Sequence, residues 1–193
     1  MKESLQQEFK QAHRKSAKPM LWVAMISMTM MFAGLTSAYV VSRSRTDWVS
    51  FNLPNAFSIS TILIVLSSLT FLMSKKFIKK GNQQITTLFL VSTLLLGLGF
   101  VYFQFDGFSQ LYQEGLYFAG DQSTVKSSFV YGITIAHLVH IFAGIIVLIV
   151  VLFNHLFKKY SATNYLGLEL GAIFWHFVDI VWIYLFFFFY FIR

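Results

Sequence analysis

Five long apolar blocks decide what this chain can fold into. Each block has about the 17–25 residues that a helix needs to cross the hydrocarbon core of a bilayer. An isolated strand would leave its backbone groups unpaired in lipid, so all five blocks are predicted to be helices. The sequence therefore predicts an all-α integral membrane bundle of five transmembrane helices, with approximate spans 20–42, 55–74, 85–104, 128–153 and 167–192.

The composition is typical of a membrane protein and excludes other classes. Only 12% of the 193 residues are charged, against about 25% in ordinary soluble domains. The formal charge of +7 comes from basic residues at the ends of the apolar blocks. We therefore reject nucleic acid as a partner and interpret these cations as topology signals. The chain has no cysteine, which excludes disulfides and thiolate metal sites.

The first 19 residues are polar, and we predict a cytoplasmic N-terminal arm at 1–19 followed by a transmembrane domain at 20–193. The first apolar block, from Met20 to Val41, is too long for a signal-peptide h-region of roughly 7–15 residues, so it is interpreted as a retained helix. Pro19 and Pro54 each precede a span. A proline suits a helix start because its missing N–H costs little there.

Lysine and arginine alternate between the two ends of the predicted bundle. The arm, the second loop and the fourth loop carry eleven of them, whereas the first loop, the third loop and the C-terminus carry four. The positive-inside rule then places the N-terminus in the cytoplasm and the C-terminus outside. The loop at 105–127, with Asp106, Glu114 and Asp121, is expected to face the exterior.

Three ionisable residues share one face of the last predicted helix. At about 100° per residue, Glu169 and His176 differ by roughly 20°, and Asp179 lies about 60° from His176 on the other side. Glu169 lies near the cytoplasmic end, and the other two lie roughly 10–15 Å deeper at a rise of about 1.5 Å per residue. A charged aspartate there costs about 2.5–3.5 kcal/mol on insertion scales. This face should therefore meet protein or a polar cleft.

The fourth predicted helix carries a histidine pair, His137 and His140, within the stretch AHLVHIFAG. Small residues recur every four positions along this helix, which favours close approach by another helix. The pair is thus a candidate polar partner for His176 and Asp179. With Glu169, these groups could in principle ligate iron, copper or zinc, but no spacing matches a defined zinc or di-iron motif. Hydrogen bonds across helices or to lipid headgroups, proton conduction and acid–base catalysis are the other roles open to them.

The C-terminal stretch GLELGAIFWHFVDIVWIYLF, with AHLVHIFAG before it, closely resembles subunit III of the haem–copper oxidases, the cytochrome c oxidase family. The resemblance runs from about residue 20 to the end of the chain. The matching positions are Ser27, Phe32, Ala33, Gly34, Gln104, His137, His140, Gly144, Gly167, Glu169, Trp175, His176, Phe177, Val178, Asp179 and Trp182.

The resemblance implies a subunit of an oxidoreductase that has no catalytic centre of its own. Subunit III binds no haem or copper, which are expected in partner subunits. It packs on subunit I, alongside subunit II and other respiratory-complex subunits, supports the stability and proton uptake of subunit I, and holds phospholipid between its helices. His137, His140, Glu169, His176 and Asp179 would then be structural polar contacts, to lipid or to subunits, and neither catalysts nor metal ligands. The chain would be a multi-pass protein of the bacterial inner membrane in aerobic respiratory electron transport.

Two departures from the family pattern qualify this expectation. Many members have seven spans, and this chain resembles the shorter bacterial form without the first two, which form one wall of the family's lipid cleft. Met28 stands where the first core helix of the family often has a glutamate. Subunit III of a quinol oxidase and a nitric-oxide-reductase accessory protein are alternatives within the resemblance. A stand-alone membrane metalloenzyme or transporter is the alternative from another class.

Overall fold

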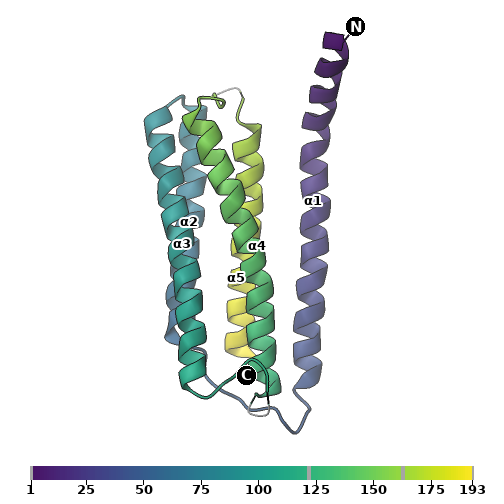
Figure 1. Cartoon of the computed structure of the whole chain (residues 1–193), viewed down its shortest axis with the longest axis vertical. Coiled ribbons are helices and arrows are strands. Elements are labelled where there is room, and N and C mark those ends of the chain that lie inside the picture. Colours follow the sequence, from purple (N-terminus) through teal and green to yellow (C-terminus); the bar gives the residue numbers. More distant parts are fainter. Residues whose placement is uncertain (1, 121–122, 162–163, 193) are drawn as a thin grey trace.

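The computed structural model describes residues 2–120, 123–161 and 164–192, and in this part of the chain all regular structure is helical. The helices are α1 (Lys2–Ser42), α2 (Asn55–Lys79), α3 (Gln83–Gln113), α4 (Val125–Leu156) and α5 (Leu166–Phe191). All five are long and apolar enough to cross a membrane. The predicted all-α bundle of five transmembrane helices is therefore confirmed. The helices alternate in direction, and the two ends of the chain lie at opposite ends of the bundle (Figure 1).

The first helix does not begin at Pro19, and that prediction is wrong. Pro19 lies inside α1, which starts at Lys2. The physical reason is the composition of the arm, which is rich in lysine, glutamate, glutamine and alanine, all strong helix formers. They extend the helix although an interior proline removes one backbone hydrogen bond. The arm therefore continues the first span and projects beyond the other helices (Figure 1). Pro54, by contrast, is the N-cap of α2 as predicted.

The third helix is longer than its apolar block. It continues past residue 104 to Gln113, so the predicted loop at 105–127 begins too early. Asp106 is helical and accepts a hydrogen bond from Nε2 of Gln110 at 2.9 Å. Such a pair, four residues apart on one face, supports a helix beyond its apolar part. Asp121 lies outside the described residues.

The last helix is the centre of the bundle. α5 packs against α1, α2 and α4. In its most apolar stretch of 18 residues, 56% of the residues are buried within the protein, compared with 17% for the corresponding stretch of α1. A tight turn at Gly81, which has a φ of 75°, joins α2 to α3. The Asn82 side chain then caps α3 by accepting the backbone N–H of Ile85. The core thus forms around α5, and α1 lies at the edge.

Candidate functional site

Two indole rings of α5 organise the interior of the bundle. Trp175 Nε1 donates a hydrogen bond to Ser67 Oγ at 3.0 Å, and Trp182 Nε1 donates to Thr61 Oγ1 at 3.0 Å. Both acceptors belong to α2. Each pair satisfies a polar N–H that would otherwise be unpaired in the core. The two bonds fix α5 against α2 at two levels, two helical turns apart.

Asp179 lies between these two indoles along α5. It is four residues after Trp175 and three before Trp182, so it shares their face. Its residue exposure is 1%. Ser68 of α2 interacts with its carboxyl group, but among the described residues neither carboxylate oxygen has a partner in good hydrogen-bond geometry. Asp179 is therefore enclosed by protein, which agrees with the expectation that this face avoids lipid.

The histidine pair of α4 meets aromatic rings. His137 is fully buried, and its ring centroid lies 5.3 Å from that of Trp182 and 6.1 Å from that of Phe100. His140 Nδ1 lies 2.7 Å from the Ala136 carbonyl oxygen of its own helix. Both imidazoles also contact Phe32 of α1 edge-on, at centroid distances of 6.1 and 5.7 Å. The pair thus joins α4 to α1.

His176 has a different hydrogen-bond partner from the one predicted. Its Nδ1 lies 2.6 Å from Ser68 Oγ of α2, whereas the sequence pointed to the histidines of α4. The reason is the rotation of α5: His176 is one residue beyond Trp175, and both side chains reach neighbouring hydroxyls of the same helix. Nothing in the sequence distinguished Ser68 from the other small polar residues of α2.

Glu169 forms an ion network at the N-terminal end of α5. Its Oε2 lies 2.8 Å from Lys18 Nζ of α1, and its Oε1 lies 3.5 Å from Lys75 Nζ of α2. The carboxylate therefore links three helices. Sequence reasoning missed both lysines as contacts because it interpreted them only as topology signals. The five predicted residues are thus distributed over several contacts and do not converge on one centre.

On α4, the small residue Gly144 makes room for the indole ring of Trp175 and not for the backbone of a neighbouring helix. A Cβ atom added at Gly144 would lie 3.1 Å from Trp175 Cε3, whereas one added at Gly132 would have no neighbour within 4 Å. A Cβ added at Gly97 of α3 would lie only 2.8 Å from the same indole. The predicted surface for close helix approach therefore accommodates the Trp175 side chain at Gly144 and has no neighbour at Gly132.

The described residues do not assemble a metal site. Among them, no group of three or more histidine, cysteine, aspartate or glutamate residues is placed to hold a metal ion. Gln104, another position of the family pattern, donates from Nε2 to Ser60 Oγ at 2.9 Å. These polar side chains connect helices within the chain.

Comparison of the sequence with known proteins identifies relatives of this chain. The cytochrome c oxidase subunit III family matches residues 2–193. A cytochrome bo(3) ubiquinol oxidase subunit 3 from Buchnera aphidicola subsp. Schizaphis graminum is 30% identical, with 88% of this chain and 90% of the relative covered. A probable cytochrome c oxidase subunit 3 from Nocardia farcinica is 30% identical, with 92% and 88% covered. The cytochrome c oxidase subunit 3 of Alkalihalophilus pseudofirmus is 28% identical, with 80% and 73% covered. These matches and the five spans show a multi-pass bacterial membrane protein, and the chain belongs to the cytochrome c oxidase subunit III family.

Proposed function

We propose that this chain is the non-catalytic subunit III of a terminal haem–copper oxidase, packed on subunit I and supporting its stability and proton uptake. The observation that carries the proposal is the family match along residues 2–193. The contacts that the ionisable residues make within the chain support the proposal. Glu169 pairs with lysines and His176 with a serine hydroxyl, as expected of groups that hold helices together. Haem and copper then belong to the partner subunits.

Two electron donors are compatible with the proposal. Relatives named as ubiquinol oxidase subunits and relatives named as cytochrome c oxidase subunits match with similar identity. We favour the cytochrome c oxidase, after which the family is named, and keep the quinol oxidase as the alternative. The companion subunit II discriminates between them, because a dinuclear copper site there marks a cytochrome c oxidase.

The proposed orientation has the N-terminus in the cytoplasm. The end of the bundle that holds the start of α1 also holds Lys75, Lys76 and Lys79 at the end of α2. Lys158 and Lys159, which follow α4, add to this positive end. A predominantly basic end is the cytoplasmic end under the positive-inside rule.

Bound phospholipid is a further part of the proposal. A cavity of about 660 Å³ lies between α1, α4 and α5 near the basic end, with Leu21, Val147 and Leu170 among its apolar wall residues. Lys18 and Glu169 directly neighbour wall residues Ala17 and Leu170. An apolar cavity beneath a charged rim suits an acyl chain whose headgroup remains at the interface.

A pull-down in mild detergent, with subunits identified by mass spectrometry, tests the role. We expect subunits I and II of one oxidase to be recovered with the full-length chain. Removal of the chain should leave an oxidase that reduces oxygen and then loses activity progressively during turnover. Stoichiometric metal retained by the isolated chain, or immediate and complete loss of oxygen reduction upon its removal, would contradict the proposal.

A further inference from the structure

Ser68 of α2 lies between two ionisable side chains of α5. Its Oγ lies 2.6 Å from Nδ1 of His176, and it also interacts with the carboxyl group of Asp179. His176 and Asp179 are three residues apart, so they are neighbours on the surface of the helix. Among the described residues the two form no direct ion pair. One hydroxyl group therefore connects an imidazole to a carboxyl group.

The imidazole and the carboxyl group differ in their access to the surroundings. Asp179 is 1% exposed, whereas His176 is half-buried beside the ring of Phe71, at a centroid distance of 6.1 Å. Neither oxygen of the Asp179 carboxyl group nor Nε2 of His176 has a partner in good hydrogen-bond geometry among the described residues. A proton on Asp179 is therefore enclosed, and its way out of the bundle leads through Ser68 and His176.

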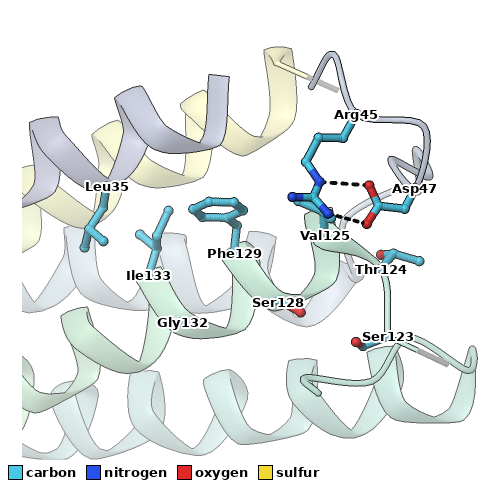
Figure 2. A pocket seen from close by; sticks show the side chains of 10 residues that line it. All are labelled: Leu35, Arg45, Asp47, Ser123, Thr124, Val125, Ser128, Phe129, Gly132 and Ile133. Atoms are coloured by element: carbon cyan, nitrogen blue, oxygen red, sulfur yellow. Dashed lines mark hydrogen bonds and ion pairs between the residues drawn. The ribbon is translucent and has the colours of Figure 1, made fainter. Parts of the chain in front are cut away.

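Asp47, which lies outside the membrane-spanning helices, shows the opposite case. Figure 2 shows its carboxylate beside the Arg45 guanidinium, whose Nε and Nη2 donate to the two carboxylate oxygens at 2.9 and 3.0 Å. These hydrogen bonds from Arg45 lower the pKa of Asp47 below its ordinary value of 3.8. Within the described part of the chain, no cation pairs with Asp179 in this way. An unpaired charge in a protein interior is costly, so Asp179 keeps its proton at neutral pH.

We propose that Ser68, His176 and Asp179 form a proton-binding site inside the membrane, which holds one exchangeable proton on Asp179 and passes it through Ser68 to His176. At rest the Asp179 O–H donates to Ser68 Oγ, and the Ser68 O–H donates to Nδ1 of His176. In the transfer, the Asp179 proton moves to Ser68 Oγ while the Ser68 proton moves to Nδ1. The products are a carboxylate, a hydroxyl group and an imidazolium, and the total charge is unchanged.

The proton count of the groups fixes the form of the imidazole at rest. A neutral imidazole has one N–H and one lone pair. Since Nδ1 of His176 accepts from Ser68, its N–H is at Nε2. His140 of α4 has the other form, because its Nδ1 lies 2.7 Å from the Ala136 carbonyl oxygen, which can only accept. The two histidines therefore carry their protons on different ring nitrogens.

The charged groups nearest to this site lie toward the basic end of the bundle. Lys75 is two turns from Ser68 on the same face of α2, and Glu169 is two turns from His176 on the same face of α5. Lys75 Nζ lies 3.5 Å from Glu169 Oε1, and Lys18 Nζ of α1 lies 2.8 Å from Glu169 Oε2. These charges are thus paired with one another and leave the proton of Asp179 to Ser68 and His176.

Aromatic rings close the other side of the site. Trp182, one turn beyond Asp179 on α5, has its ring centroid 5.3 Å from that of Phe100 and 5.3 Å from that of His137. Neither ring nitrogen of His137 has a hydrogen-bond partner among the described residues, so the relay does not continue there. The site therefore stores a proton and does not conduct one across the membrane. It lies within this chain, so a failure of this inference leaves the proposed oxidase role untouched.

Infrared spectroscopy of the full-length chain in mild detergent, with isotope-labelled aspartate, tests the inference. We expect the spectrum at neutral pH to contain the carbonyl band of a protonated carboxylic acid, and this band should be lost in Asp179→Asn. After transfer to deuterated water the band should shift as the proton exchanges for a deuteron. A spectrum with carboxylate bands alone at neutral pH would overturn the inference.

Two neighbouring serines distinguish the relay from local opening of the helices. Ser68→Ala should slow the exchange about tenfold, the factor expected when the path loses one hydrogen bond to a charged group, and Ser68→Thr should restore it because threonine keeps the hydroxyl group. Ser67→Ala is the matched control, since Ser67 Oγ accepts from the Trp175 indole and takes no part in the relay. Circular dichroism checks that each variant is folded. If Ser68→Ala exchanges as fast as the unaltered chain, or if both alanine variants exchange faster, the proton leaves by local opening and the inference is wrong.

Discussion

Gly97 of α3 provides the sharpest test of how α5 is seated in the bundle. A methyl group at this position would lie 2.8 Å from Cη2 and 2.9 Å from Cζ2 of Trp175. The indole cannot easily move away, because it is 1% exposed and its Nε1 donates to Ser67. Overpacking of a close-packed interior costs about 1–3 kcal/mol. The clash in Gly97→Ala should therefore cost about this amount before the gain in helix propensity is counted.

Two other glycines turn this expectation into a graded series. At Gly144 an added Cβ would lie 3.1 and 3.2 Å from atoms of the same indole, which is tight but less severe. At Gly34 it would meet nothing within 4 Å. Replacement of a helical glycine by alanine also raises helix propensity by about 1 kcal/mol in soluble hosts. All three substitutions include this gain, so the comparison with Gly34→Ala removes it.

The assay is reversible unfolding of the full-length chain in detergent micelles, followed by circular dichroism and tryptophan fluorescence. We expect the free energy of unfolding to decrease in the order Gly34→Ala, Gly144→Ala, Gly97→Ala. The difference between the first and the last should be about 1–3 kcal/mol. A Gly97→Ala protein as stable as Gly34→Ala would refute the packing of Trp175 against α3.

Three further predictions concern polar contacts. A double-mutant cycle with Ser68→Ala and His176→Leu should give a coupling free energy of about 1 kcal/mol, while the haem spectrum of the assembled oxidase stays normal; zero coupling would exclude the 2.6 Å contact. Glu169→Gln should lower the free energy of unfolding by less than about 1 kcal/mol, because Lys18 and Glu169 remain partly in solvent, and high salt should reduce the difference; an effect independent of salt would contradict an ion pair. The pKa of Asp47 is lowered, so its pairing with Arg45 is present above the ordinary value of 3.8 and is lost as the pH falls through the lowered pKa. The chemical shift of the Asp47 carboxyl carbon should then be unchanged between about pH 7 and 5 and change only in stronger acid; a titration midpoint near pH 6 would contradict the pairing.

The sequence predicts the helices well because a single long apolar block can pair its own backbone groups in lipid only as a helix. Every backbone group must be paired within the segment, so block length alone indicates a spanning helix. Helix ends are less constrained, since polar helix formers extend a helix into water. The continuation of α1 through Pro19 and of α3 to Gln113 both follow from this.

Contacts between helices are harder to predict from the sequence than the helices themselves. Periodicity gives the direction in which a side chain points on its own helix, but not which neighbour stands there. His176 and Asp179 pointed inward as expected, yet the partner of His176 is Ser68 of α2. The lysine partners of Glu169 were visible in the sequence. However, positive-inside reasoning assigns a cation to an end of the bundle, and contains no information about its contacts.

The attachment of α1 shows why such polar contacts matter in a membrane protein. Lipid tails are as apolar as leucine, so the hydrophobic effect does not press one transmembrane helix against another. α1 is tied to α5 near both ends of its span: Lys18 pairs with Glu169, and Tyr39 donates to the Ile192 carbonyl at 3.0 Å. Between these ties, Phe32 meets the two imidazoles of α4. Ion pairs and hydrogen bonds thus fix the position of a helix that buries little of its own surface. Glu169 and the two imidazoles of α4 thus hold the edge of the bundle in place.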